Sequence, residues 1–403
     1  MFRSRISPIF SMLLACSLPV TSLPIRGAIG GDKTAPTSEI TFELWNTQLP
    51  FPSSQDLLPI EGIEFRVIKP RVPEQDGYDW LHGVALAWHK GRLYSSFGHN
   101  SGAENTATEE ANGRISDDGG KTWGPLFQID AGEEPNLAIS HGVFLSHQGR
   151  LWAFHGAFYG RMQDVHTRAY SLDESTGNWV SKGIIAKDGF WAMQEPQRMA
   201  NGNWIMAGIS VTAGYGGTND PAAVAICRSD NLTKWDVIKI PKPASMEMWG
   251  ESCVILDGPN ILDVSRYRKP MALVATSENY GETWSTIRES NMPMAGSQPS
   301  AGMLSTGQRF LICSTTADGG NQRHPLTIAV GNPNEETFCR VYRIRDAIHV
   351  GPGESAHNAA LAYPYAIEHE GRLYVGYSNS GGRGGNRNSA ELAIIPIEAL
   401  QAK

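Results

Sequence analysis

Cysteine and charge are both sparse in this chain. Its 403 residues include five cysteines, and 19% of the residues are charged. No two cysteines form a Cys-x-x-Cys pair, so their spacing predicts no zinc or redox motif. We expect the four that follow Cys16 to be buried free thiols and predict no metal site, although the sequence leaves open a structural Ca²⁺ in a central tunnel. The net charge is −7 with no basic stripe, which argues against a nucleic-acid partner.

Long apolar runs are also lacking beyond the N-terminus. Arg3 and Arg5 precede an apolar run from Ile9 to Val20, which is too short to span a bilayer and is typical of a signal peptide. We expect residues 1–28 to be a signal peptide and the protein to be exported, to the periplasm or outside the cell. A lipid anchor at Cys16 is the less favoured alternative. No later segment predicts a membrane span.

Glycine is abundant, with 43 residues, and six glycines mark a repeat. Each stands between two short apolar strands, roughly fifty to sixty residues from the next. The six are Gly91, Gly149, Gly202, Gly258, Gly307 and Gly371. A glycine accepts the positive φ that a tight hairpin demands. A period near fifty residues is typical of propeller blades.

A second motif recurs in phase with these hairpins. Residues 116–123 and 277–284 both match S-x-[DN]-x-G-x-T-W, and degenerate copies end at Trp179 and Trp235. In such a motif the Asp or Asn side chain bonds backbone N–H groups, and the Trp packs between neighbouring units. We therefore interpret the motif as a structural turn without a catalytic role.

The motif resembles the Asp-box of sialidases and related β-propellers. The resemblance implies an all-β propeller of four-stranded blades, six by the hairpin count, with the two ends of the chain paired to close the ring. Residues 390–397 would form the third strand of the last blade and residues 64–69 the fourth. We divide the chain into the signal peptide, a linker with an N-terminal strand at 29–62, and a catalytic propeller domain at 63–403.

The position just before each inner strand should lie at one rim of the central axis. These positions hold a set of polar residues: His82, His141, Glu195, Glu251, Gln298 and Tyr363. Trp80, Trp191 and Trp249 lie a few residues before members of that set. Titratable groups beside flat apolar faces favour a sugar site. The alternative is that these side chains satisfy one another around a water-filled tunnel.

The sialidase pattern is matched in part. Glu251 stands where sialidases keep the Glu that activates their nucleophile, and Tyr363 stands near the nucleophilic Tyr. Arg266 and Arg323 resemble the second and third carboxylate-binding arginines. The first arginine is replaced, because Leu81-His82-Gly83-Val84 occupies its place. Histidine does not supply bidentate Arg–carboxylate geometry, so the pattern disfavours sialidase activity.

A second resemblance concerns the first and last blades. Residues 97–106, 363–367 and 388–393 resemble propeller enzymes that release L-rhamnose from α-1,4-linked glucuronate, as lyases or as rhamnosidases. That family has seven blades, so seven stays open beside six. It uses a histidine of the first blade, which implies His99 or His82 as catalytic here. Asn100 and Glu104 are the expected binding residues of the same stretch.

The chemistry leaves two reactions open. Elimination from a uronate needs an acid and a base, which histidine supplies near neutral pH, and cations beside the carboxylate. The candidate cations are Arg161, Arg266, Arg323 and Arg383, the last in a Gly-rich segment that is either a turn or a lid. Hydrolysis would instead use two carboxyl groups, drawn from Glu104, Glu195 and Glu251.

We therefore predict an exo-acting enzyme that removes a terminal sugar from an acidic oligo- or polysaccharide without a required cofactor. The rhamnosyl-glucuronate substrate is the favoured one. The alternatives are a sialidase-like glycosidase that uses Glu251 and Tyr363, and a non-catalytic glycan-binding propeller.

Overall fold

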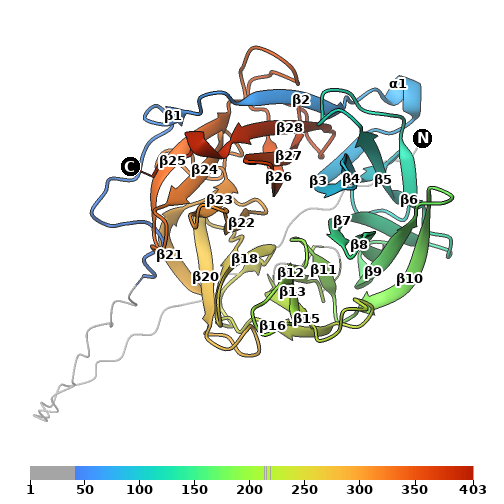
Figure 1. The fold of residues 1–403 in the computed structure, drawn as a ribbon, viewed down its shortest axis with the longest axis horizontal. Coiled ribbons are helices and arrows are strands. Elements are labelled where there is room, and N and C mark those ends of the chain that lie inside the picture. The colour runs from blue at the N-terminus through green and yellow to red at the C-terminus, as the bar shows by residue number, and fades with distance from the viewer. Residues whose placement is uncertain (1–40, 213, 215, 218, 403) are drawn as a thin grey trace, which may run out of the picture. The chain divides into compact units, whose positions relative to one another are not determined.

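The computed structural model describes residues 41–212, 214, 216–217 and 219–402, which belong to one compact unit. The predicted signal peptide, Cys16 and the first part of the expected linker lie outside the described residues. Within these residues, six antiparallel sheets surround a central axis (Figure 1). The predicted all-β propeller is thus confirmed with six blades, and the alternative of seven is wrong. No helix among the described residues is long and apolar enough to cross a membrane.

Each of the first three blades runs from an inner strand at the axis to an outer strand at the rim. The first comprises β3 (Trp80–His89), β4 (Arg92–Asn100), β5 (Glu109–Ser116) and β6 (Phe127–Asp130). The second comprises β7 (Leu137–His147), β8 (Arg150–Tyr159), β9 (Gln163–Asp173) and β10 (Asn178–Ala186). The third has its inner strand split into β11 (Phe190–Ala192) and β12 (Gln197–Arg198), followed by β13 (Trp204–Ser210), β15 (Ala222–Cys227) and β16 (Asp236–Lys239).

The last three blades follow the same plan. The fourth comprises β18 (Ser252–Asp257), β19 (Asn260–Ser265), β20 (Met271–Ser277) and β21 (Arg288–Pro293). The fifth comprises β22 (Ser300–Met303), β23 (Arg309–Cys313), β24 (Leu326–Gly331) and β25 (Phe338–Arg345). The sixth comprises β26 (Leu361–His369), β27 (Arg372–Asn379), β28 (Ser389–Pro396) and β2 (Glu64–Lys69).

Five short elements of the described chain lie outside this plan. β1 (Leu58–Pro59) adds a parallel strand to the outer edge of the fifth blade, and β14 (Asn219–Asp220) pairs with β17 (Met248–Trp249). The helices are α1 (Pro73–Asp76) and the 3₁₀ turn η1 (Ile397–Ala399).

The ring closes where the two ends of the chain meet. β2 pairs antiparallel with β28, as the sequence predicts, so the last blade takes its outer strand from the N-terminal side. The described part of the expected linker packs on the propeller, where Leu44 is fully buried and Trp45 is 4% exposed. There is no regular strand at residues 41–45; Phe42 and Trp45 instead form isolated bridges to the fourth and fifth blades.

The hairpin glycines and the Asp-boxes have the predicted roles. All six hairpin glycines have positive φ and join the first two strands of a blade. In the first Asp-box, Asp118 accepts hydrogen bonds from the Thr122 backbone and hydroxyl at 2.9 and 2.6 Å. A Cβ on Gly120 would lie 2.7 Å from the side chain of Leu392, so this turn packs against the neighbouring blade. In the second box, Asn279 Oδ1 accepts a hydrogen bond from the Thr283 backbone at 2.9 Å, and Asn279 Nδ2 donates to the Thr283 hydroxyl at 2.9 Å.

The four described thiols are all free, as expected. Cys227, Cys253 and Cys313 are buried within blades, whereas the expectation is wrong for Cys339, which is only partly buried in β25.

Candidate functional site

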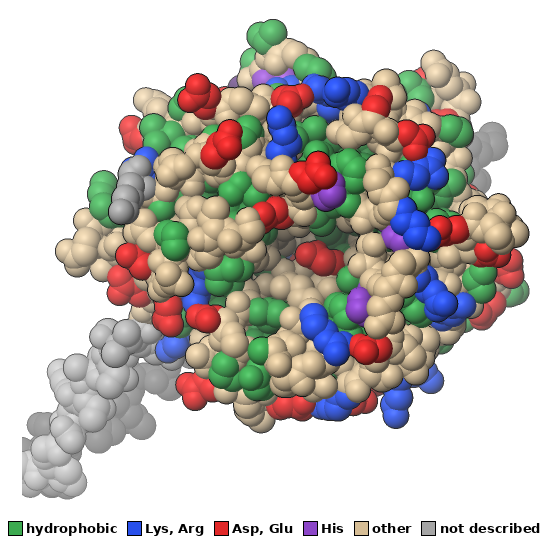
Figure 2. Space-filling model, viewed as in Figure 1, with side chains coloured by type: hydrophobic (Ala, Val, Ile, Leu, Met, Phe, Trp, Pro, Cys, Tyr) green, Lys and Arg blue, Asp and Glu red, His purple; other side chains and the backbone are tan. Residues whose placement is uncertain are grey.

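A cavity of about 350 Å³ lies where the six blades converge. We call it the central cavity. Its lining contains three carboxylates, two guanidiniums, four large aromatic rings and one imidazole. These are Glu104, Asp220 and Glu251; Arg266 and Arg323; Trp80, Trp191, Trp249 and Tyr363; and His141. Figure 2 shows one face of the molecule, hollowed at the centre of the ring with an acidic group inside the hollow.

Three of these side chains form a connected unit. The Tyr363 hydroxyl donates a short hydrogen bond to Glu251 Oε1. Arg266 Nη1 lies 2.7 Å from Glu251 Oε2 and 3.2 Å from the Tyr363 hydroxyl oxygen. Burial raises the pKa of Tyr363 well above its usual value, and the neighbouring Glu251 carboxylate adds to this. The phenol is therefore held protonated, with its proton directed at a carboxylate that can accept it.

Irregular backbone aims these side chains. The pairing of β26 with β27 has a bulge between Ala362 and Tyr365, and Tyr363 there adopts φ 53°. A non-glycine residue in the left-handed region is strained, and such strain is concentrated at functional sites. The inner strands β3 and β7 carry bulges at the same level, at residues 82–85 and 139–142. A bulge adds an unpaired residue to one strand and changes the direction in which the neighbouring side chains point.

Gly83 shows how tightly the first two blades approach each other. It has φ 67°, and a Cβ at this position would lie 2.5 Å from the His141 ring. Only glycine meets both conditions. His82 and Gly83 stand where the sialidase pattern has its first arginine, and at this point the first blade packs closely against His141 of the second blade.

Two buried histidines adjoin Tyr363. The His82 ring centroid lies 3.8 Å from that of Tyr363, and the His141 centroid lies 5.6 Å from it. Burial lowers the pKa of His141 to about 3 and that of His82 well below its usual value. Both rings are therefore neutral at pH 7. His82 Nδ1 lies 3.2 Å from the Asn388 amide nitrogen, whereas its Nε2 has no hydrogen-bond partner among the described residues.

Glu104 reaches the cavity from the loop between β4 and β5. Asn386 Nδ2, in the Gly-rich segment of the sixth blade, donates to Glu104 Oε1 at 2.7 Å. Burial raises the pKa of Glu104, and this hydrogen bond partly offsets the effect. Glu104 therefore favours the protonated form more than an exposed carboxyl group does.

The cations of the cavity are fixed by packing. Arg323 Nη2 donates to the Gly296 carbonyl at 2.9 Å, and its guanidinium carbon lies 5.8 Å from the Tyr363 ring centroid. The Trp249 ring lies against two guanidiniums, those of Arg266 at 4.6 Å and Arg268 at 4.3 Å. Trp249 therefore orients cations in addition to lining the cavity.

The structure brings together most of the predicted rim. His141, Glu251 and Tyr363 line the cavity and His82 packs against Tyr363, as the blade alignment predicts. Gln298 lies deeper, where its amide donates to the Met193 carbonyl and its oxygen accepts from the Tyr365 hydroxyl.

His99 is outside the cavity lining. It pairs with Leu81 in the β3–β4 ladder, whereas His82 pairs with Gly98. Paired residues of a ladder share one face of the sheet, and successive residues of a strand alternate between the two faces. The His99 ring and the His82 ring therefore lie on opposite faces of the first blade. The His99 ring stacks on Tyr78 with a centroid separation of 3.8 Å, and it is 1% exposed. Burial lowers its pKa to about 2.

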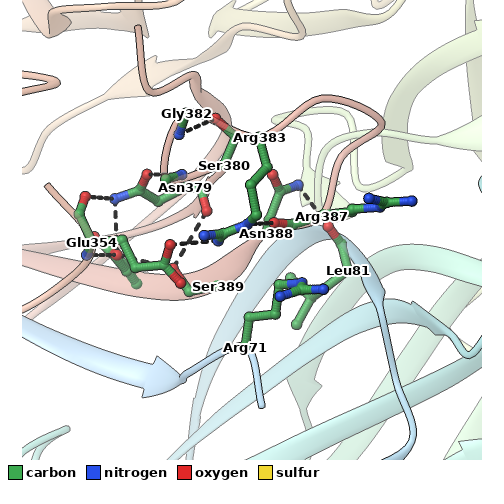
Figure 3. Close-up of polar contacts among 12 residues, drawn as sticks. Arg71, Leu81, Glu354, Asn379, Ser380, Gly382, Arg383, Arg387, Asn388 and Ser389 are labelled. Atoms are coloured by element: carbon green, nitrogen blue, oxygen red, sulfur yellow. Dashed lines mark hydrogen bonds and ion pairs between the residues drawn. The ribbon is translucent and has the colours of Figure 1, made fainter. Parts of the chain in front are cut away.

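Four other expected binding residues also lie outside the cavity lining: Asn100, Arg161, Glu195 and Arg383. The Asn100 side chain bonds the backbone of its own loop at residues 102 and 103. Arg161 is exposed. Burial raises the pKa of Glu195 to about 7. Arg383 points to Glu354 and pairs with it, so the lid interpretation of its segment has no support in this placement (Figure 3).

Several cavity residues were not expected from the sequence, and Asp220 and Asn386 are two that carry polar side chains into the lining. Asp220 follows a Gly-rich stretch and lines the cavity with 4% exposure. Asn386 lies three residues beyond Arg383, in the same Gly-rich segment, and also lines the cavity. The sequence signal that could have identified both residues is the cluster of glycines just before each of them. Such clusters indicate that the backbone approaches a ligand or another segment. Among the residues described, no group of three or more His, Cys, Asp or Glu side chains could hold a metal ion.

Comparisons with known proteins agree with this architecture. The model of the BNR repeat-like domain family matches residues 98–375. Among curated proteins, none matches this chain in sequence. The fold is similar to that of the NanB sialidase from Streptococcus pneumoniae, with 12% identity, a TM-score of 0.62 and coverage of 84% of this chain and 71% of that one.

Two further solved structures are similar. A Dyadobacter fermentans protein of unknown function has 14% identity and a TM-score of 0.61, over 84% of this chain and 100% of that one. The leech intramolecular trans-sialidase has 10% identity and a TM-score of 0.62, over 80% of this chain and 69% of that one. At such identities the likeness concerns the fold.

Proposed function

Since the chain belongs to the BNR repeat-like domain family, and Tyr363, Glu251 and Arg266 meet in its central cavity, we propose that it is an exo-acting glycosidase for a terminal acidic sugar. The contact among these three side chains is the observation that carries the proposal. A tyrosine whose proton is directed at a carboxylate is an activated nucleophile. Arg266 and Arg323 supply positive charge for the carboxylate of the sugar.

The roles follow from the placement of the groups. Tyr363 attacks the anomeric carbon while Glu251 accepts its proton, and protonated Glu104 gives its proton to the departing sugar oxygen. The glycosidic bond breaks as a glycosyl–tyrosine bond forms. Glu104 then takes a proton from water, and the water oxygen attacks the anomeric carbon as the glycosyl–tyrosine bond breaks. The Tyr363 oxygen recovers its proton from Glu251. Two displacements at one carbon retain its configuration.

The test is Tyr363→Phe, assayed on 4-methylumbelliferyl glycosides of acidic sugars. We expect kcat to fall at least about a hundredfold while the melting temperature stays close to that of the wild type. The matched control is Tyr342→Phe, which removes a hydroxyl that bonds the Gln401 carbonyl outside the cavity. Nuclear magnetic resonance of the first product should show retained anomeric configuration. Near-normal turnover of Tyr363→Phe, or inversion, would overturn the mechanism.

A lyase or rhamnosidase acting at a rhamnosyl-glucuronate linkage is the second candidate. The observation that favours it is the neutral His82–His141 pair against Tyr363, with an unpartnered His82 Nε2. A neutral imidazole can accept a proton from C5 of a uronate, and Arg266 and Arg323 would stabilise the charge that develops on its carboxylate.

The two candidates differ in product and in sensitivity to mutation. With rhamnose-capped glucuronate oligosaccharides, elimination gives an unsaturated uronate that absorbs ultraviolet light, and hydrolysis gives free rhamnose without that absorbance. His141→Ala should abolish elimination and lower glycosidase turnover less than Tyr363→Phe does. Binding of acidic oligosaccharides without any product would instead favour the non-catalytic propeller.

A further inference from the structure

A second cavity of about 430 Å³ adjoins the central cavity between the second and third blades. We call it the side cavity. Met162, Val211 and Gly214 line both cavities, so the two are neighbours. The rest of the side-cavity lining comes from the end of β8, the start of β9, the end of β10 with the segment that follows it, and Thr212 after β13. A ligand that extends from the central cavity past these shared residues would reach the side cavity.

The two cavities differ in their cations. The central cavity has the guanidiniums of Arg266 and Arg323 beside its three carboxylates, whereas the described lining of the side cavity has no arginine and carries Asp164, Asp188 and Lys187. Among the described residues, the side chains of these three make no hydrogen bond or ion pair with the protein. Without a guanidinium, this lining offers no bidentate partner for the carboxylate of an acidic sugar, and its carboxylate oxygens accept hydrogen bonds from hydroxyl or ammonium groups.

His166 provides an independent indication of a ligand. It lines the side cavity at 4% exposure, and its Nδ1 lies 2.6 Å from the Asp164 carbonyl. A carbonyl only accepts, so Nδ1 carries the hydrogen and Nε2 is an acceptor. Nε2 has no partner among the described residues. Burial lowers the pKa of His166, which keeps the ring neutral. A buried acceptor without a partner costs free energy unless a ligand donates to it.

We propose that the side cavity binds the sugar to which the terminal acidic sugar is attached, and that this second sugar is neutral or an amino sugar. The proposal rests on the proposed glycosidase function. Apolar side chains of Val165, Ile184 and Val211 line the same space, and they suit the C–H face of a pyranose. The side cavity then selects the leaving group, and the central cavity selects the sugar that is cleaved.

The experiment compares leaving groups on one terminal acidic sugar, chosen by the 4-methylumbelliferyl screen. Three substrates carry that sugar on 4-methylumbelliferone, on lactose and on glucuronate. For the wild type we expect kcat/KM to be at least about tenfold higher with lactose than with glucuronate as the leaving group. Asp188→Asn and Asp164→Asn should each lower kcat/KM for the lactose-linked substrate about tenfold, through KM, because each removes a charged acceptor.

The controls isolate the side cavity. Both aspartates have positive φ, which asparagine tolerates, so the backbone should be preserved. Turnover of the aryl glycoside should stay within about twofold, and Glu61→Gln, at an exposed carboxylate elsewhere, should change neither substrate. Equal kcat/KM for the lactose and glucuronate leaving groups, or an equal loss on the aryl glycoside, would overturn the proposal.

Failure of the glycosidase function can be told apart from failure of the side cavity. If the wild type cleaves no aryl glycoside, lactose and chitobiose are titrated into the protein by calorimetry. Binding to the wild type that Asp188→Asn weakens supports the sugar site, and absence of binding by both disaccharides overturns it.

Discussion

Glu104 and Asn386 illustrate how a single hydrogen bond can tune a candidate acid. The Asn386 amide stabilises the charged form of Glu104, whereas burial stabilises the neutral form. Asn386→Ala removes the stabilisation of the charged form, so the pKa of Glu104 should rise further. Since Glu104 acts as an acid when protonated, the alkaline limb of the kcat/KM profile should move to higher pH. A profile measured beside Asn332→Ala, a change away from the cavity, tests this. An unmoved limb would remove Glu104 as the acid.

His99 shows that the resemblance to a family and the geometry can point in different directions. The ring is enclosed by Tyr78 and Phe97, and Asn112 lies within hydrogen-bond distance of its Nδ1. We expect His99→Ala to destabilise the protein by roughly 2–4 kcal/mol, because it leaves a cavity and an unpaired amide. The kcat of the folded protein should stay within about threefold of the wild type. Urea unfolding and steady-state kinetics measure both. A stable variant with a hundredfold lower kcat would return His99 to the mechanism.

At the scale of the element, the inner strands could be predicted and their irregularities could not. Alternating apolar residues and a hairpin glycine repeat locally, so the strands and the rim position before each one follow from the sequence. The bulges at His82, His141 and Tyr363 depend on register with a partner strand, and no local signal specifies them. Asn386 and Glu104 are 282 positions apart and meet only because the first and last blades are neighbours in the ring.

The Asp-box turn gives a prediction at the same scale. Hydrogen bonds from Thr122 and Ser116 lower the pKa of Asp118 to about 2. The folded pKa lies below that of an unfolded aspartate, about 3.9, so the stabilisation is present above pH 4 and is lost as pH falls toward 2. Asp118→Ala should lower the melting temperature by roughly 2–5 °C at pH 6 and leave kcat unchanged.

The pH dependence separates this turn from a general charge effect. The difference in melting temperature between the wild type and Asp118→Ala should shrink as the pH falls from 4 to 2.5. Asp117→Ala removes an exposed neighbour whose ion pair with Arg92 contributes little, so it should have a small effect at every pH. A constant deficit across this range would mean that Asp118 acts through something other than its charge.

At the scale of the whole molecule, the site exists only when the ring is closed. The central cavity takes residues from all six blades, so Glu104 of the first blade and Tyr363 of the sixth are in place only if those two blades pack together. That packing depends on β2, which lies at the N-terminal side of the described chain and completes the sixth blade. Closing the ring pairs strands that are far apart in sequence, which costs conformational entropy. The apolar contacts that form on closure must offset this cost.

Ile68 of β2 tests this dependence. It is fully buried in the apolar cluster that joins the first and sixth blades, together with Leu81 and Leu392. Ile68→Ala should lower the free energy of unfolding by about 2–5 kcal/mol, as expected for a large-to-small change in a core. The matched control is Leu58→Ala, because Leu58 lies on the outer strand β1 and is 43% exposed.

The measurement is urea unfolding followed by tryptophan fluorescence, with activity recorded at each concentration. Because the cavity needs both end blades, activity and fluorescence of Ile68→Ala should be lost in one transition, shifted to lower urea. Hydrogen exchange should accelerate in β28 and β3 together, since the two strands share this cluster. If Ile68→Ala were no more destabilising than Leu58→Ala, the blades would hold without the closing strand, and the site would not depend on closure of the ring.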